Sequence, residues 1–227
     1  MKKHFSTELA YALGLIFIAL SVALMQRANF GLSMIVAPAY ILHLKISEFL
    51  PFFSFGMAEY TLQAVILLLL SAILRKFKIS YIFSFVTAFI YGILLDRIIE
   101  LVALLPYDSF AAHIIYYILG LVICALGVAL MFRTYIPPEA YDLFVMEFSG
   151  HFSLNISKVK TVYDCTSCLV ALILSFSFFG FGHFRGISYG TVITALLNGT
   201  IIGIFSRFLN KKFEFYDALP LRKYFTK

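Results

Sequence analysis

Long apolar runs, separated by short polar segments, dominate the chain. Six runs approach or exceed the length that a bilayer-spanning helix needs, about 20 mostly apolar residues. They lie near 8–27, 51–74, 79–98, 112–132, 161–182 and 187–208. This pattern predicts an all-α integral membrane protein with six transmembrane helices.

The composition agrees with a membrane protein and excludes several soluble classes. Apolar residues make up 62% of the 227 residues, and charged residues 13%. That charged share is about half of what a soluble globular domain carries. An ordinary soluble enzyme, a disordered tail and a nucleic-acid-binding domain are therefore excluded, although the net charge is +6. Membrane lipids are an expected partner, and nucleic acid is not.

The basic residues predict the orientation of the chain. Six spans place both termini on one side, and most of the 18 Lys and Arg residues fall in the segments on that side. This bias predicts that both termini, including the tail 211–227, are cytoplasmic. It also predicts that the segment 28–50 does not fully cross the membrane, because a seventh span would invert all later segments.

An internal repeat divides the chain into two halves. Residues 13–27 and 119–133 are identical at ten of fifteen positions without a gap. The third span of each half also matches, with Thr87, Ala88 and Gly92 aligned on Thr194, Ala195 and Gly199. Three spans per half force the halves to enter the membrane in opposite senses. We therefore expect one transmembrane domain over 1–227, made of inverted repeats at about 8–104 and about 112–210.

Inverted-topology repeats are the architecture of many secondary transporters. The leading functional prediction is a transporter or permease for an unidentified small molecule, working by alternating access at the repeat interface. The alternative is a non-transporting accessory or scaffold protein. We do not expect an enzyme, because no acid–base or metal constellation converges in the sequence. Catalytic residues, metal ligands and cofactors are accordingly not expected, and a homo-oligomer is left open.

Two irregular segments follow the first and fourth spans, at 29–44 and 135–149. Each opens with a helix breaker, Gly31 in the first and Pro137–Pro138 in the second. Both are too short or interrupted to span a membrane, yet too apolar for a free loop. Two interpretations are open: a re-entrant half-helix buried in the protein, or a helix lying flat at the interface.

Polar side chains inside or beside the apolar runs are the expected substrate-binding residues. They are Glu59, Gln63, Glu139, Asp142, Asp164, Thr191, Thr194 and Asn198. Intramembrane ionisable residues are costly and are typical of functional sites. The structural alternative for Asp164 is an ion pair with Lys160, one helical turn away. For the Thr191, Thr194 and Asn198 face, it is hydrogen bonding between helices.

Several motifs resemble the YczE/YitT family of bacterial inner-membrane proteins. They are 28–33, 142–149, 157–160 with Asp164, and 188–199, which reads SYGTVITALLNG. The resemblance covers about residues 10–210. It implies a multi-pass protein of the bacterial plasma (inner) membrane from a largely uncharacterised family, and it names no substrate.

The chain departs from the family pattern at the acidic positions. The family's Pro-Trp-Asp after the first span reads Met34-Ile35-Val36 here, and its Gly-Pro-Arg-Asp in the second half reads Glu139-Ala140-Tyr141-Asp142. The first-half acid is thus missing. A site that takes one such acid from each half is not expected, and Asp142 would act alone.

Overall fold

The computed structural model describes residues 3–180, 186–220 and 222, which form eight helices and two short strands. Six helices are long and apolar enough to cross a membrane, which indicates a multi-pass membrane protein. They are α1 (Thr7–Ala28), α3 (Phe55–Leu74), α4 (Ile79–Val102), α5 (Phe110–Met131), α7 (Ile156–Phe179) and α8 (Tyr189–Lys212). The six expected spans are confirmed to within a few residues. The expected end of the fifth span at 181–182 lies outside the described residues.

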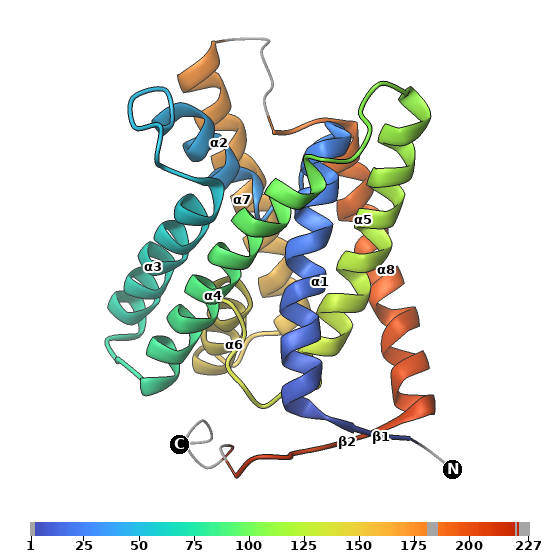
Figure 1. Ribbon diagram of the computed structural model, residues 1–227. Helices are drawn as coiled ribbons and strands as arrows, with labels where there is room; N and C mark the ends of the chain where they lie inside the picture. The colour runs from blue at the N-terminus through green and yellow to red at the C-terminus, as the bar shows by residue number, and fades with distance from the viewer. Residues whose placement is uncertain (1–2, 181–185, 221, 223–227) are drawn as a thin grey trace.

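The helices α1 and α5 form the central pair of the bundle. α1 rises from the end that carries both termini, and α5 runs back toward that end (Figure 1). Gly14 and Gly127 meet across this contact: a Cβ at either glycine would lie 3.0–3.2 Å from the other's carbonyl oxygen. Small residues of this kind allow transmembrane helices to approach closely. α4 then packs on α1, and α8 packs on α5.

Two short helices stand at opposite ends of the bundle. α2 (Ala37–Ile46) lies at the end away from the termini, and α6 (Ala140–His151) lies near the termini (Figure 1). Their 10 and 12 residues are too few to cross a membrane. Each packs on both α3 and α7. They occupy the two segments in which the sequence predicted interrupted helices.

The contact between α3 and α4 is made by backbone against backbone. A Cβ at Gly56 would lie 2.0 Å from the carbonyl oxygen of Gly92, so both positions require glycine. Asp96 on α4 secures the start of α3, because its carboxylate accepts hydrogen bonds from Ser54 Oγ at 2.5 Å and Gly56 N at 2.7 Å. In the second half, as far as the structure describes it, α7 and α8 make almost no contact with each other, and a Cβ at Gly199 would meet no described atom within 4 Å.

A two-stranded parallel sheet joins the termini, a feature that the sequence did not predict. β1 (Lys3–Ser6) pairs with β2 (Phe213–Tyr216), with Phe5 opposite Phe215. The Phe5 ring also packs edge-on against Phe213 at 5.4 Å. This sheet lies beneath the ends of α1 and α8 (Figure 1).

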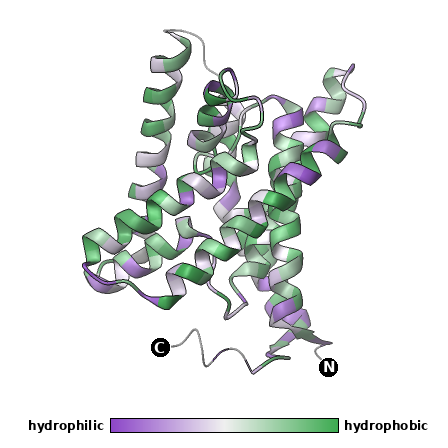
Figure 2. Cartoon of the chain, turned by 60° about the vertical axis from the view of Figure 1, so that its left-hand side comes forward, coloured by the Kyte–Doolittle hydropathy of each residue, from purple (hydrophilic) through white to green (hydrophobic). Residues whose placement is uncertain are grey.

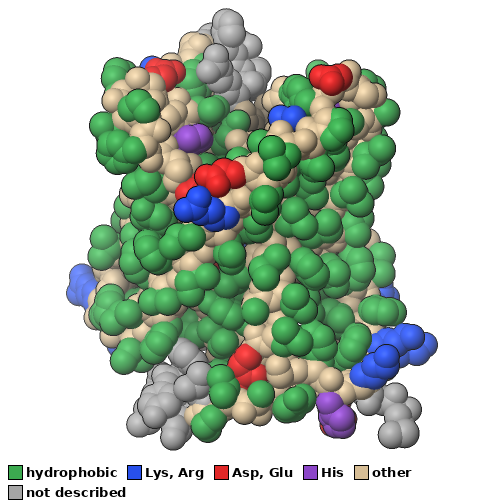
Figure 3. All heavy atoms as spheres, viewed as in Figure 1, with side chains coloured by type: hydrophobic (Ala, Val, Ile, Leu, Met, Phe, Trp, Pro, Cys, Tyr) green, Lys and Arg blue, Asp and Glu red, His purple; other side chains and the backbone are tan. Residues whose placement is uncertain are grey.

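The outer surface of the bundle suits a hydrocarbon environment. Hydrophobic residues cover most of the helical length, and hydrophilic residues concentrate near the helix ends and connecting segments (Figure 2). The face in Figure 3 is covered largely by hydrophobic side chains, including the middle of the molecule. Large apolar side chains such as Leu68, Val162 and Leu196 are each about two-thirds exposed or more, as expected for residues that contact lipid tails.

We expect Gly56→Ala to destabilise the protein by about 1–3 kcal/mol, the usual cost of forcing an extra carbon into a packed contact. The matched control is Gly199→Ala, which adds the same carbon to α8 where no atom lies within 4 Å. The free energy of unfolding is measured in detergent, with circular dichroism as the readout. Equal stability of the two variants would contradict the close α3–α4 contact.

Candidate functional site

A small cavity lies where the two irregular segments meet inside the bundle. Its volume is about 90 Å³, enough for several water molecules. The segments before α2 and α6 both contribute to its wall, at 33–36 and 138–142. α1, α4, α5 and α8 supply the rest. The polar side chains of the lining are Ser33, Tyr91, Cys124, Glu139, Tyr141, Asp142 and Asn198.

The backbone interruption before α6 is satisfied by side chains of α3 and α4. Ser84 Oγ donates to the Pro138 carbonyl at 2.7 Å, and Thr87 Oγ1 donates to the Pro137 carbonyl at 3.1 Å. The amide oxygen of Gln63 accepts from Ala140 N at 3.0 Å and so caps the first turn of α6. The sequence placed Pro138 within this first turn. The helix begins two residues later, because the proline carbonyls are turned toward α4.

The interruption before α2 is satisfied by the segment that leads into α8. Leu32 N donates to the Gly186 carbonyl at 3.1 Å, and Gly190 N donates to the Phe30 carbonyl at 2.8 Å. Gly31 between them has a φ of 98°, which favours glycine. Each half of the chain therefore satisfies a backbone interruption in the other half.

Gln63 connects two carboxyl groups. Its Nε2 donates to Glu139 Oε2 at 3.1 Å and lies 3.5 Å from Glu59 Oε2. Glu59 Oε2 also accepts from the Tyr141 hydroxyl at 2.8 Å. Glu59 and Gln63 are fully buried, and Glu59 Oε1 has no hydrogen-bond partner among the described residues. Three residues that the sequence singled out separately are thus one hydrogen-bonded group.

Glu139 faces the cavity from the N-cap position of α6. Burial away from bulk water, followed by the negative charges of Glu59 and Asp142, raises the pKa of Glu139 to about 8. Hydrogen bonding from Gln63 and the positive charge of Lys160 oppose this rise.

Asp142 and Asp164 share one lysine. Lys160 Nζ lies 3.0 Å from Asp142 Oδ1 and 3.6 Å from Asp164 Oδ1. The three side chains are about a quarter to a third exposed. The ion pair that the sequence offered as the structural alternative for Asp164 is therefore present. Lys160 also reaches Asp142 from α7, a contact that the sequence did not predict.

Two polar side chains face the cavity with unused hydrogen-bonding groups. Asn198 Nδ2 lies 3.9 Å from Cys124 Sγ, but its Oδ1 has no partner among the described residues. The Tyr91 hydroxyl likewise has none, and Tyr91 is only 1% exposed. Sequence reasoning missed Tyr91. The sequence feature that could have identified it is a polar hydroxyl in the middle of an apolar span, one helical turn after Thr87.

Thr191 and Thr194 lie outside this cavity lining. Thr194 Oγ1 is 2.8 Å from the Tyr117 hydroxyl, which donates to the Gly190 carbonyl. Thr191 Oγ1 accepts from Ser188 N at the start of α8. These bonds join α5 to α8 and cap α8, and of the expected polar face only Asn198 lines the cavity.

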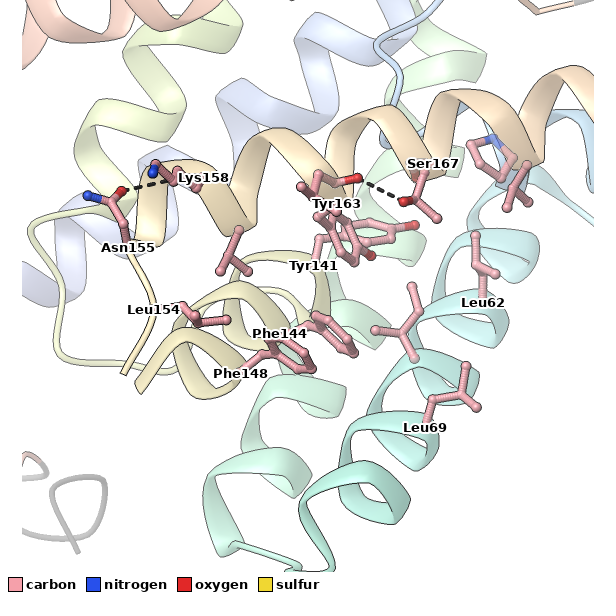
Figure 4. A pocket seen from close by; sticks show the side chains of 16 residues that line it. Leu62, Leu69, Tyr141, Phe144, Phe148, Leu154, Asn155, Lys158, Tyr163 and Ser167 are labelled. Atoms are coloured by element: carbon pink, nitrogen blue, oxygen red, sulfur yellow. Dashed lines mark hydrogen bonds between the residues drawn. The ribbon is translucent and has the colours of Figure 1, made fainter. Parts of the chain in front are cut away.

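A larger apolar groove of about 550 Å³ lies between α3, α6 and α7. Figure 4 shows Leu62 and Leu69 on α3, opposite α7, with Phe144 and Phe148 of α6 between them. Lys158 and Asn155 form a polar rim at one end. Tyr141 lines both this groove and the central cavity, so its side chain forms part of the wall between them. Among the described residues, no three His, Cys, Asp or Glu side chains are arranged to hold a metal ion.

A family model described as a family of unknown function (DUF6198) matches residues 5–207. This match supports an uncharacterised family, as the resemblance implied, but it does not name the YczE/YitT family specifically. No curated protein and no solved structure matches the chain.

We expect Gln63→Leu to lower the free energy of unfolding by about 1–3 kcal/mol, because it leaves a buried backbone N–H and two carboxyl groups without their partner. The control is Thr61→Ala on the exposed face of the same helix. Thermal unfolding in detergent measures both. A loss no larger than that of the control would show that Gln63 does not hold α6 in place.

Stability should also depend on pH through Glu139. The folded state keeps the Glu139 proton up to a pH of about 8, whereas the ordinary pKa is 4.5. This stabilising contribution is complete below about pH 4.5 and is lost as the pH rises through about 8. Melting temperatures measured across this range should fall less steeply in Glu139→Gln than in the wild type. If the melting temperatures of the two proteins fell equally with pH, the raised pKa of Glu139 would be contradicted.

Proposed function

We propose that this chain, which belongs to the DUF6198 family, is a transporter that carries a small molecule across a membrane by alternating access. The observation that carries the proposal is the central cavity. Its walls come from both irregular segments, and it contains hydrogen-bonding groups that have no partner in the described part of the chain. Residues from both halves of the chain form the walls of this cavity. Relative movement of the halves would open it to one side and then to the other.

The arrangement of helices supports two inverted repeats. If α1–α4 are matched in order with α5–α8, the α1–α4 contact corresponds to the α5–α8 contact. The contacts of α2 with α3 and α7 likewise correspond to those of α6 with α7 and α3. α2 and α6 lie at opposite ends, as inverted units require (Figure 1). Among the described residues the matched contacts differ in two respects. α3 packs tightly on α4, whereas α7 and α8 make almost no contact, and α4 contacts α6, whereas α8 makes no comparable contact with α2.

The proposed substrate site combines Glu139, Asp142 and Asn198 in the cavity wall with Glu59 and Gln63 behind them. Asp164 contributes by sharing Lys160 with Asp142. Thr191 and Thr194 would act indirectly, by holding α8 and its Asn198 against α5. No reacting group needs to be assigned, since the proposed activity moves a molecule without changing it.

The proposed orientation follows from the basic residues of the sequence. The end of the bundle with both termini and α6 would face the cytoplasm, and α2 would lie near the outer side of the bacterial inner membrane. Both short helices would be re-entrant, because their first residues meet at the internal cavity rather than at the surface.

The native Cys124 provides a test that does not depend on the substrate. Cys124 is buried and lines the cavity, and Cys165 and Cys168 can be changed to serine to leave it as the only thiol. We expect a membrane-impermeant thiol reagent to label Cys124 when applied to either side of sealed vesicles, since each half-cycle exposes the cavity to one side.

The control for this experiment is the same chain with Cys124 also replaced by serine, which should not be labelled. Labelling from neither side would favour the accessory or scaffold alternative, in which the interior stays sealed. Labelling from one side only would contradict alternating access.

A further inference from the structure

We infer that Glu59 and Glu139, bridged by Gln63, form a proton-binding pair that couples proton movement to the proposed transport. The inference rests on the proposed function and identifies its coupling ion. A proton would be taken from water at one side, held on a carboxylate oxygen of the pair, and released to water on the other side.

The first argument is the lack of a neutralising partner. Among the described residues, no Lys, Arg or His forms an ion pair with Glu59 or Glu139. The nearby Lys160 is engaged by Asp142 and Asp164, a group that already carries one more negative than positive charge. Buried acids without a counter-ion bind a proton rather than keep their charge, because an isolated buried carboxylate is very costly.

The second argument is the geometry of the amide between the two acids. Gln63 Oε1 is fixed by Ala140 N, which leaves its Nε2 directed at Glu139 and Glu59. The amide therefore brings two acidic groups close together without offering either one a positive charge. Two carboxyl groups whose charges interact at this range titrate as a pair rather than independently.

The third argument is access to water. Glu139 lines the cavity together with Asp142, whose side chain is 32% exposed. Tyr141 also lines the cavity and donates its hydroxyl to Glu59. The fully buried Glu59 is thus one hydroxyl away from a space large enough for water. Chains of acidic side chains inside the membrane form the proton relays of pumps and transporters.

Other titratable groups on five helices interact with the pair. They come from α1, α4, α5, α6 and α7 and are Tyr11, Tyr91, Cys124, Tyr141, Asp142, Lys160 and Tyr163. Lys160 is the only cation in this set, and its charge is opposed by the adjacent aspartates. The surroundings therefore favour protonation of the pair.

Infrared spectroscopy of the purified full-length protein tests the inference, because the C=O stretch of a protonated carboxyl group is distinct from the carboxylate bands. We expect the wild-type protein to show a protonated-carboxyl band at neutral pH that disappears as the pH rises. The double variant Glu59→Gln/Glu139→Gln should lose this band. Glu59→Gln alone should move its midpoint to lower pH, because a like charge next to Glu139 has been removed.

The control is Glu100→Gln, which changes an exposed glutamate of α4 and should leave the band unchanged. Circular dichroism establishes that each variant is folded. If the double variant does not fold, Glu139→Gln alone must still alter the band. A wild-type protein without a titrating band, or a band unaffected by these variants, would overturn the inference.

The outcome is separable from that of the Cys124 experiment. If Cys124 is labelled from both sides but no titrating band is seen, the proposed transport function is supported and the proton-binding pair is overturned. A titrating band in a protein whose Cys124 is sealed would overturn the coupling of the proton to transport.

Discussion

The constraint on which the structure depends is the hydrogen bonding of interrupted backbone inside a membrane. Lipid tails offer no donors or acceptors, so every break in a helix must be satisfied by protein groups. The described part of this chain has two such breaks, and in each case the partners come from distant segments. Ser84, Thr87 and Gln63 bind the turn before α6, and residues 186–190 bind the turn before α2. Positions of polar residues in the interior follow from this need.

Gln63 shows how a structural requirement and a chemical one meet in a single side chain. Its oxygen caps α6, and its nitrogen reaches Glu139 and approaches Glu59. The same amide that fixes a half-helix therefore assembles the two acids of the proposed proton site. Any movement of α6 relative to α3 would change the distance between these acids, which is the type of link between shape and protonation that a coupled transporter needs.

The sequence predicted the positions of the helices better than the contacts between distant residues. Apolar runs, Gly31 and Pro137–Pro138 are local signals, and they located the six long helices and both short ones. The carboxyl and amide groups in apolar runs also pointed to Glu59, Gln63 and Glu139. Contacts between distant segments were harder to predict from the sequence. Lys160 lies one turn from Asp164 in sequence, but only the packing of α6 on α7 brings Asp142 to it. The hydrogen bond between Tyr117 and Thr194 and the pairing of β1 with β2 likewise join segments that are far apart in the sequence.

The unequal packing of the two halves has a mechanical consequence. The interlocked glycines of α3 and α4 leave no room for sliding, so the first half behaves as a stiff frame. Among the described residues α7 and α8 make almost no contact, so neither helix holds the other in place. The lateral pressure of a bilayer would therefore displace α7 and α8 relative to each other more easily than α3 and α4.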